Sequence, residues 1–156
     1  MTIQQEAYRL IDSMSDDSVR FLVEFIHGLL PESTASAVPK VRNDENARVA
    51  NIKKMDRIAL LQDNWNGNGA KAIPETLVLK VRNLLETIDF QPDIFPTACD
   101  TIQFEYDMQN GGHLEIEISE DDRAECFMID ADGRESSEEI MTDAASINRK
   151  VTEFYG

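Results

Sequence analysis

The sequence predicts an α+β fold, a small antiparallel sheet of three to four strands packed on one face by helices, with an N-terminal helical hairpin. Three observations predict this class. The 156 residues suffice for one domain of ordinary size. Apolar residues recur at helical spacing over the first 30 residues and again after Pro74. From about residue 102 the apolar spacing changes to two, as in strands that bury one face.

The N-terminal hairpin is predicted for residues 1–30, where one amphipathic helix is followed by a second that starts after Ser15. The second helix carries apolar residues around more of its circumference than the first helix can cover. Phe21, Phe25 and Leu29 are therefore the candidate interface residues. The surface that they form is expected either to contact a second copy or a partner, or to pack against the rest of the chain.

Residues 31–39, PESTASAVP, combine two prolines with small residues, which is the composition of a linker. An α+β domain is expected over residues 40–156. Its first stretch, about 40–62, is charged and predicted to be helical, and a further helix should begin at Pro74, because proline is favoured at the first helical position. The apolar stripe of that further helix comprises Leu77, Val78, Val81, Leu84, Leu85 and Ile88.

The sheet is predicted from segments in which apolar and polar residues alternate. Two of them, 102–106 and 114–118, are joined by DMQNGG, whose Asn-Gly-Gly turn predicts an antiparallel hairpin. A third strand is expected at about 125–130. Ser136 and Glu139 then match a capping box, which predicts that the last helix begins there.

Acidic residues outnumber basic ones by thirty to fifteen, which gives a net charge of −15. Such a surface repels phosphate backbones, so nucleic acid is not expected as a direct ligand. No apolar run approaches the roughly 20 residues of a membrane span and no secretory signal is recognised, which predicts a cytoplasmic protein without a membrane partner. Cys99 and Cys126 have neither disulfide-scaffold nor zinc-site spacing. No metal, cofactor or catalytic residue is predicted.

The negative charge is concentrated in the predicted sheet. Residues 100–139 contain fourteen acidic residues and two arginines, a net charge of −12. Because like charges on neighbouring strands destabilise a sheet, a cationic counterpart is expected. It is either a basic protein or a divalent metal; the remaining alternative is a face that only contacts solvent. The candidate ligands for a metal are His113, Glu105, Glu115, Glu117 and Asp130. The candidate partner-binding residues are Glu105, Glu115, Glu117, Glu120, Asp121 and Asp122.

An unusual loop, DNWNGNGAKAIP, surrounds the only tryptophan, Trp65. Gly67 and Gly69 each follow an asparagine, and Asn-Gly pairs favour positive backbone dihedrals. A glycine-rich loop can hold a phosphate, but this loop has neither of the common phosphate-loop spacings. The alternative is a structural loop in which Trp65 plugs the core.

Two parts of the chain resemble known sequences. Residues 1–30, with Q-x-E-A-Y-x-L-I-D-x-M-S-x-D-S-V, look like the short helical N-terminus of antitoxin-like proteins from bacterial toxin–antitoxin operons. The segment from Trp65 to Pro74, followed by L-E-I-E-I at 114–118, is similar to an uncharacterised family of small bacterial and phage proteins with a W-[DN]-G-x-G-A motif and an L-E-I-E-I strand. One extra residue before Ile73 departs from the family pattern. The resemblance implies a common fold and transfers no activity.

The function expected from these observations is non-catalytic binding of the antitoxin or inhibitor type. The acidic sheet would mask a basic partner, a toxin or other effector that handles nucleic acid, and a phage anti-defence inhibitor that imitates the charge of DNA is one version. The N-terminal hairpin would supply dimerisation. Two alternatives stay open: a metal-dependent hydrolase that uses His113 and sheet carboxylates, and a DNA-binding autoregulator that uses the basic residues between 40 and 57.

Overall fold

A computed structural model gives the fold and describes residues 3–29 and 40–156. In that part of the chain it has five helices and one five-stranded antiparallel sheet, so the predicted α+β class is confirmed. The helices are α1 (Ile3–Ser13), α2 (Asp16–Leu29), α3 (Glu45–Ile58), α4 (Glu75–Thr87) and α5 (Ala144–Tyr155). The strands are β1 (Asp93–Pro96), β2 (Ile102–Asp107), β3 (His113–Ile118), β4 (Arg123–Ile129) and β5 (Glu135–Met141). The predicted linker, 31–39, lies outside the described residues.

The sheet is an open meander in which each strand pairs antiparallel with the next, in the order β1-β2-β3-β4-β5. The predicted hairpin is present as β2 and β3, with Ile102 opposite Ile118 and Tyr106 opposite Leu114. Its turn is closed by a hydrogen bond from the Met108 N–H to the Gly112 carbonyl at 2.8 Å. Gly111 in this turn has a φ of 90°, a conformation that favours glycine.

Five strands replace the three to four expected, and the prediction of a helix start at Ser136 is wrong. Ser136 lies in β5 opposite Met128, and the last helix begins eight residues later, where the Asp143 carboxylate accepts a hydrogen bond from the Ser146 N–H at 2.8 Å. The segment Glu135–Glu139 is exposed on both faces, so it shows no apolar alternation and its Ser-x-x-Glu spacing is not a cap. The other unexpected strand, β1, is a short edge strand that tolerates Pro96 at its end.

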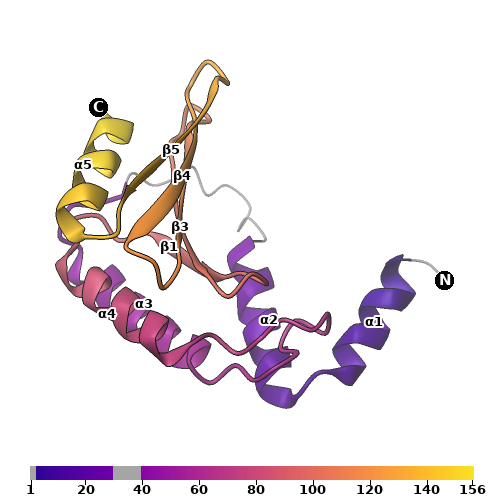
Figure 1. Ribbon diagram of the computed structural model, residues 1–156. Coiled ribbons are helices and arrows are strands. Elements are labelled where there is room, and N and C mark those ends of the chain that lie inside the picture. Colours follow the sequence, from indigo (N-terminus) through magenta and orange to yellow (C-terminus); the bar gives the residue numbers. More distant parts are fainter. Residues whose placement is uncertain (1–2, 30–39) are drawn as a thin grey trace.

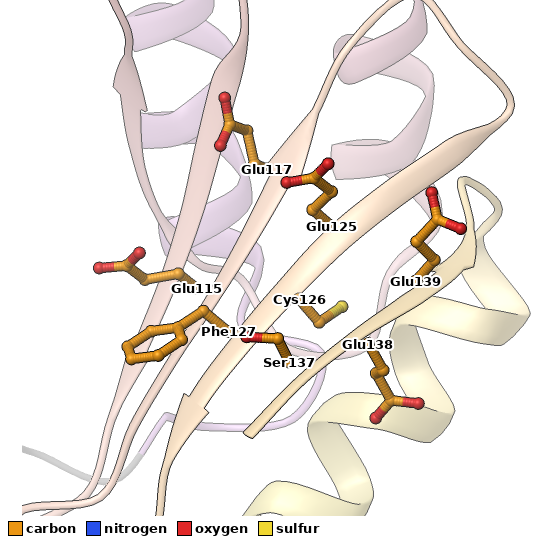
Figure 2. Close-up of a pocket in the computed structure, with 8 residues that line it drawn as sticks. All are labelled: Glu115, Glu117, Glu125, Cys126, Phe127, Ser137, Glu138 and Glu139. Atoms are coloured by element: carbon orange, nitrogen blue, oxygen red, sulfur yellow. The ribbon is translucent and has the colours of Figure 1, made fainter. Parts of the chain in front are cut away.

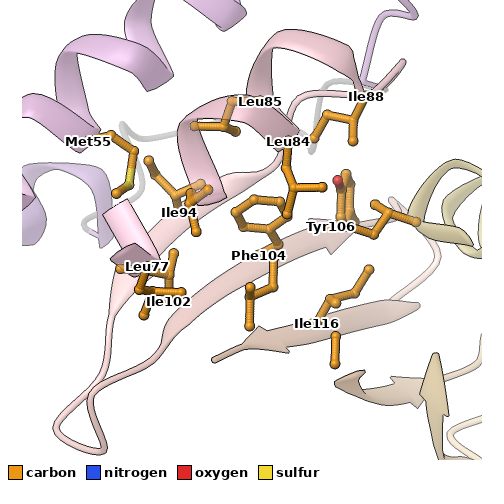
Figure 3. Close-up of a cluster of buried hydrophobic side chains, with 14 of the residues drawn as sticks. Met55, Leu77, Leu84, Leu85, Ile88, Ile94, Ile102, Phe104, Tyr106 and Ile116 are labelled. Atoms are coloured by element: carbon orange, nitrogen blue, oxygen red, sulfur yellow. The ribbon is translucent and has the colours of Figure 1, made fainter. Parts of the chain in front are cut away.

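Two helices, α4 and α5, cover the apolar face of the sheet. Figure 1 shows α4 and α5 on the same side of the strands. Ile102, Phe104 and Tyr106 of β2 are fully buried beneath the apolar stripe of α4 (Figure 3). The same side of β3 and the facing side of α5 complete the core, with Leu114, Ile116, Ile118, Ile147, Val151 and Phe154. The opposite face of the sheet is therefore available to carry the polar residues of each strand.

Helix α2 packs against the loop around Trp65 and the edge strand β1. Phe21 of α2 makes an edge-to-face contact with Trp65, at 6.4 Å between ring centroids, and Phe25 makes one with Phe95 at 5.3 Å. Across the ranges 3–29 and 40–156, every helix is too short or too polar to cross a bilayer.

Candidate functional site

The polar face of the sheet, here called the outer face, carries the acidic residues that the sequence singled out. Because side chains alternate along a strand, burial of Ile116 and Ile118 places Glu115 and Glu117 on the opposite side. The register sets Glu105 directly opposite Glu115 on neighbouring strands. The structure therefore brings three of the six predicted binding residues together on one face.

Two further glutamates extend this face toward β5. Glu117 on β3 is opposite Glu125 on β4, and Glu125 is opposite Glu139 on β5. Figure 2 shows the three side chains, here called the acidic row, on the same side of three consecutive strands. Directly opposed residues on neighbouring strands have Cβ atoms about 5 Å apart, so the three carboxylates are close enough to repel one another.

The acidic row lies between two adjoining open hollows. One, of about 330 Å³, contains Glu115 and Phe127 beside the row, and the other, of about 520 Å³, contains Asp121 and Asp122. Among the described side chains that line the two hollows, Arg123 is the one cation. The surface is thus concave and strongly negative, and Phe127 adds an aromatic ring to it.

Ion pairing does not neutralise the acidic row. Within the described residues, no lysine or arginine lies within 4.0 Å of a carboxylate oxygen of Glu117, Glu125 or Glu139. Glu117 accepts a neutral hydrogen bond from the Thr101 hydroxyl at 2.7 Å. The negative charge of the row is therefore open to a partner.

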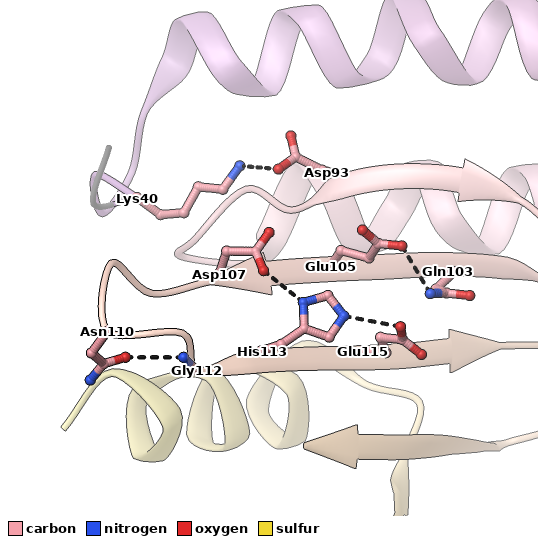
Figure 4. A network of polar contacts seen from close by, with 9 residues as sticks. All are labelled: Lys40, Asp93, Gln103, Glu105, Asp107, Asn110, Gly112, His113 and Glu115. Atoms are coloured by element: carbon pink, nitrogen blue, oxygen red, sulfur yellow. Dashed lines mark hydrogen bonds and ion pairs between the residues drawn. The ribbon is translucent and has the colours of Figure 1, made fainter. Parts of the chain in front are cut away.

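At the β1 end of the outer face, lysine side chains lie close enough to offset the negative charge. Lys40 pairs with Asp93 at 2.9 Å, and Lys54 lies 4.4 Å above the ring of Phe95 (Figure 4 shows the first pair). Burial lowers the pKa of Lys54, against the attraction of Asp93. Burial also raises the pKa of Glu105, with its acidic neighbours adding to the effect. The unbalanced charge is consequently greatest over β3, β4 and β5.

His113 connects two carboxylates on this face. Its Nδ1 lies 2.6 Å from Asp107 Oδ1, and its Nε2 lies 3.0 Å from Glu115 Oε1 (Figure 4). Burial alone lowers the pKa of His113, but the hydrogen bonds and charges of Asp107 and Glu115 outweigh it and raise the pKa above its ordinary value. The imidazolium form can donate to both carboxylates, so His113 supplies local charge compensation.

The β3–β4 turn separates the three remaining predicted residues. Asp121 and Asp122 line the larger hollow. Glu120 instead accepts a hydrogen bond from the Thr76 hydroxyl of α4, on the helix-covered side. Lys80 of α4 fixes the turn by donating to backbone carbonyls at 3.3, 2.8 and 2.5 Å; these belong to Ser119, Glu120 and Asp121. Five of the six predicted residues therefore share the outer face or its hollows, and Glu120 does not.

Glu125, Phe127 and Glu139 belong to the site but were absent from the sequence-based set. Alternation with buried Ala124 and Cys126 could have identified Glu125 and Phe127. No such signal was available for Glu139, because its strand has exposed residues on both sides up to that position.

The Trp65 loop has the geometry of a structural plug. The indole N–H donates to the Lys71 carbonyl at 3.0 Å, and Gly67 and Gly69 have φ values of 73° and 83°. Asparagine side chains accept hydrogen bonds from the loop's own backbone; the N–H donors are those of Asn68, Gly69 and Ala70. Because these N–H groups are already bonded, the loop offers them to no phosphate, which favours the plug over the phosphate site.

Two of the three candidate interface residues on α2 contact other parts of the same chain. Phe21 contacts Trp65 and Phe25 contacts Phe95, which favours packing over an intermolecular contact for these two side chains. An apolar groove of about 380 Å³ lies between them and α1. The side chain of Leu29 lies outside the described residues.

Two arrangements that the sequence raised, a metal-ligand cluster and a His113–Cys126 pair, are absent from the described residues. In the described part of the chain, no three His, Cys, Asp or Glu side chains are placed to hold a metal ion. Alternation puts His113 on the outer face and Cys126 on the buried side, and burial raises the pKa of Cys126 to about 11, which disfavours the thiolate. The metal-dependent hydrolase therefore has no ligand set among these residues.

The basic residues between 40 and 57 are largely engaged within the chain. Arg42 pairs with Asp89 at 2.6 Å and Arg48 pairs with Glu45 at 2.7 Å, in addition to the contacts of Lys40 and Lys54 described above. A DNA-binding surface would need these cations to be directed outward together.

Comparisons with protein-family models, with curated proteins and with solved structures found no match to the chain.

Proposed function

We propose that this chain is a non-catalytic binding protein of the antitoxin or inhibitor type, whose outer face masks a basic surface of a partner that handles nucleic acid. The observation that supports this proposal is the acidic row, three carboxylates on consecutive strands without an ion-pairing lysine or arginine among the described residues. Imitation of the charge of DNA remains one version of the proposal.

A cationic partner would relieve repulsion between carboxylates of the outer face. Each pair of like charges directly opposed across strands costs a few tenths of a kcal/mol up to about 1 kcal/mol. Glu117 with Glu125 and Glu125 with Glu139 are two such pairs, and Glu105 with Glu115 is a third that His113 compensates in part. A cationic surface laid over the outer face would convert this repulsion into attraction, and its approach would be accelerated by the long-range field.

The N-terminal hairpin of α1 and α2 has a separate role in this proposal, which is contact between two copies of the chain. Because Phe21 and Phe25 pack internally, the contact would use other residues of α2. Among the described side chains of α2, Val23, which is 44% exposed, is the apolar one best placed for it.

The experiment that tests the binding face compares two variants of equal net charge. The first replaces the acidic row (Glu117→Gln, Glu125→Gln, Glu139→Gln), and the control replaces three acids elsewhere (Glu75→Gln, Glu86→Gln, Asp132→Asn). Poly-L-arginine of defined length is the probe, titrated at low salt. We expect the row variant to lose at least about tenfold in affinity and the control to lose less than about twofold. Equal losses would show that only net charge matters and would contradict the proposal.

A further inference from the structure

β5 forms an open edge of the sheet. Residues Glu135–Glu139 are all exposed. The other edge strand, β1, has α3 beside it, and Asn51 of α3 donates a hydrogen bond at 2.9 Å to the carbonyl of Pro92, the residue before β1. Figure 1 shows β5 as the last strand of the sheet. An edge strand presents unpaired backbone donors and acceptors that a further strand can bond.

The hydrogen bonds at the two ends of the β4–β5 pair establish which backbone groups point outward. The Asp130 N–H donates to the Arg134 carbonyl at 3.0 Å, and the Thr142 N–H donates to the Asp122 carbonyl at 2.8 Å. In an antiparallel pair every second residue bonds to the neighbouring strand, so Ser136, Glu138 and Ile140 direct their backbone N–H and C=O groups toward β4. The residues that present N–H and C=O groups to the open side are Glu135, Ser137, Glu139 and Met141. No backbone bond from another described segment occupies these groups.

The side chains of β5 disfavour its pairing with the β5 strand of a second copy of the chain. Antiparallel pairing of two β5 strands would place glutamates of one copy beside glutamates of the other, which is unfavourable. A cationic strand would meet complementary charge, since Glu135 and Glu139 are exposed on the outer face. Glu138 points the other way, where it pairs with Lys150 of α5, and so ties the edge to the helix.

We propose that β5 accepts an extended basic segment of the partner protein as a sixth strand. This inference rests on the proposed function and specifies how the partner docks. The added strand would lie next to Glu139, at the β5 end of the acidic row. On the outer face it would carry a cation opposite Glu139, a small residue opposite Ser137 and a second cation opposite Glu135. An apolar residue would lie opposite Met141, which is 47% exposed. The partner segment therefore reads apolar, basic, small and basic at alternate positions.

The probe is a peptide with that pattern, Val-Thr-Arg-Thr-Thr-Thr-Arg, and its control is Val-Thr-Thr-Arg-Thr-Arg-Thr, which has the same composition but places the arginines on the other side of the strand. Ser137→Pro removes the N–H that would bond the peptide and leaves the bonds between β5 and β4 in place. Ser137→Ala is the matched control that keeps the N–H.

We expect Ser137→Pro to weaken binding of the patterned peptide at least about tenfold and Ser137→Ala less than about twofold. Thermal unfolding of both variants checks the fold. Independently of any variant, amide hydrogen exchange of Ser137 and Glu139 in the natural sequence should slow when the peptide is added, because these two N–H groups become bonded.

Two outcomes overturn strand addition: unchanged exchange at Ser137 and Glu139 in the presence of bound peptide, or equal affinity for the two peptides. If the acidic-row variant still loses poly-L-arginine binding in that case, the proposed function stands and only the docking mode fails. If the row variant and its control bind poly-L-arginine equally, the proposed function fails as well.

Discussion

Glu117 and Glu125 lie directly opposite each other on β3 and β4, with their side chains on the same face and, within the described residues, no ion-pairing lysine or arginine. A protein selected for stability alone would place opposite charges at such a pair. The arrangement therefore lowers the stability of the free chain and raises its attraction for a cation.

The first prediction concerns this stability cost. Glu125→Gln should raise the free energy of unfolding by about 0.2–1 kcal/mol, because it removes the middle charge of the acidic row. Urea denaturation at about 0.01 M and about 1 M salt measures the effect, which should shrink as the Debye length falls from about 30 Å to about 3 Å. Glu86→Gln on α4 is the control and should change stability little. A destabilised Glu125→Gln variant would mean that this carboxylate has a favourable partner.

The second prediction concerns pH. The folded chain holds the proton of His113 more tightly than the unfolded chain, since Asp107 and Glu115 raise the pKa of His113 above 6.5. This stabilisation is complete below pH 6.5 and is lost as pH rises through the raised pKa. Denaturation from about pH 5 to pH 9 should show falling stability, and His113→Gln should remove that step.

Glu105 provides the control for the pH experiment. Its pKa is also raised, so deprotonation of Glu105 likewise lowers stability as pH rises from its ordinary value of 4.5. Glu105→Gln should therefore flatten the acidic end of the profile and keep the His113 step. Loss of both steps in one variant would show that the two groups titrate together.

The predictable part of the fold is the part with a single buried face. β2 and β3 alternate strictly because Phe104 and Ile116 face the helices while Glu105 and Glu117 face outward, and that pattern is visible in the sequence. β5 has no buried residue before Ile140, so its Ser and Glu residues are equally compatible with a helix start. Misplacing β5 also removed Glu139 from the predicted site.

The site itself depended on register, which local patterns specify weakly. Placement of His113 between Asp107 and Glu115 requires the six-residue pairing of β2 with β3, which follows from the turn at Gly111. The opposition of Glu125 and Glu139 requires β5 to exist as a strand. Composition thus predicted the acidic face, and only the sheet register defined the acidic row.

The third prediction concerns the Trp65 loop. Gly67→Ala and Gly69→Ala should each lower the free energy of unfolding by about 1–2 kcal/mol, because both positions have positive φ. An added Cβ at Gly67 would lie 3.4 Å from Leu10 Cδ2, an ordinary contact, and one at Gly69 would meet no atom within 4 Å. The two costs should therefore agree within about 0.5 kcal/mol, as measured by denaturation. A much larger cost at Gly67 would indicate tighter packing of α1 on the loop.

The fourth prediction separates internal packing from self-association on α2. Phe25→Ala removes the contact with Phe95 and should therefore lower the free energy of unfolding by about 2 kcal/mol. The cost is below the roughly 3–5 kcal/mol of a fully buried phenylalanine because Phe25 is only half-buried. Phe25→Ala should leave the oligomeric state unchanged in sedimentation. Val23→Glu should do the reverse, dissociating the proposed dimer while changing the stability of the chain by less than about 0.5 kcal/mol. If Phe25→Ala dissociates the dimer and Val23→Glu does not, the contact between copies uses the aromatic side chains after all, and their packing on Trp65 and Phe95 competes with it.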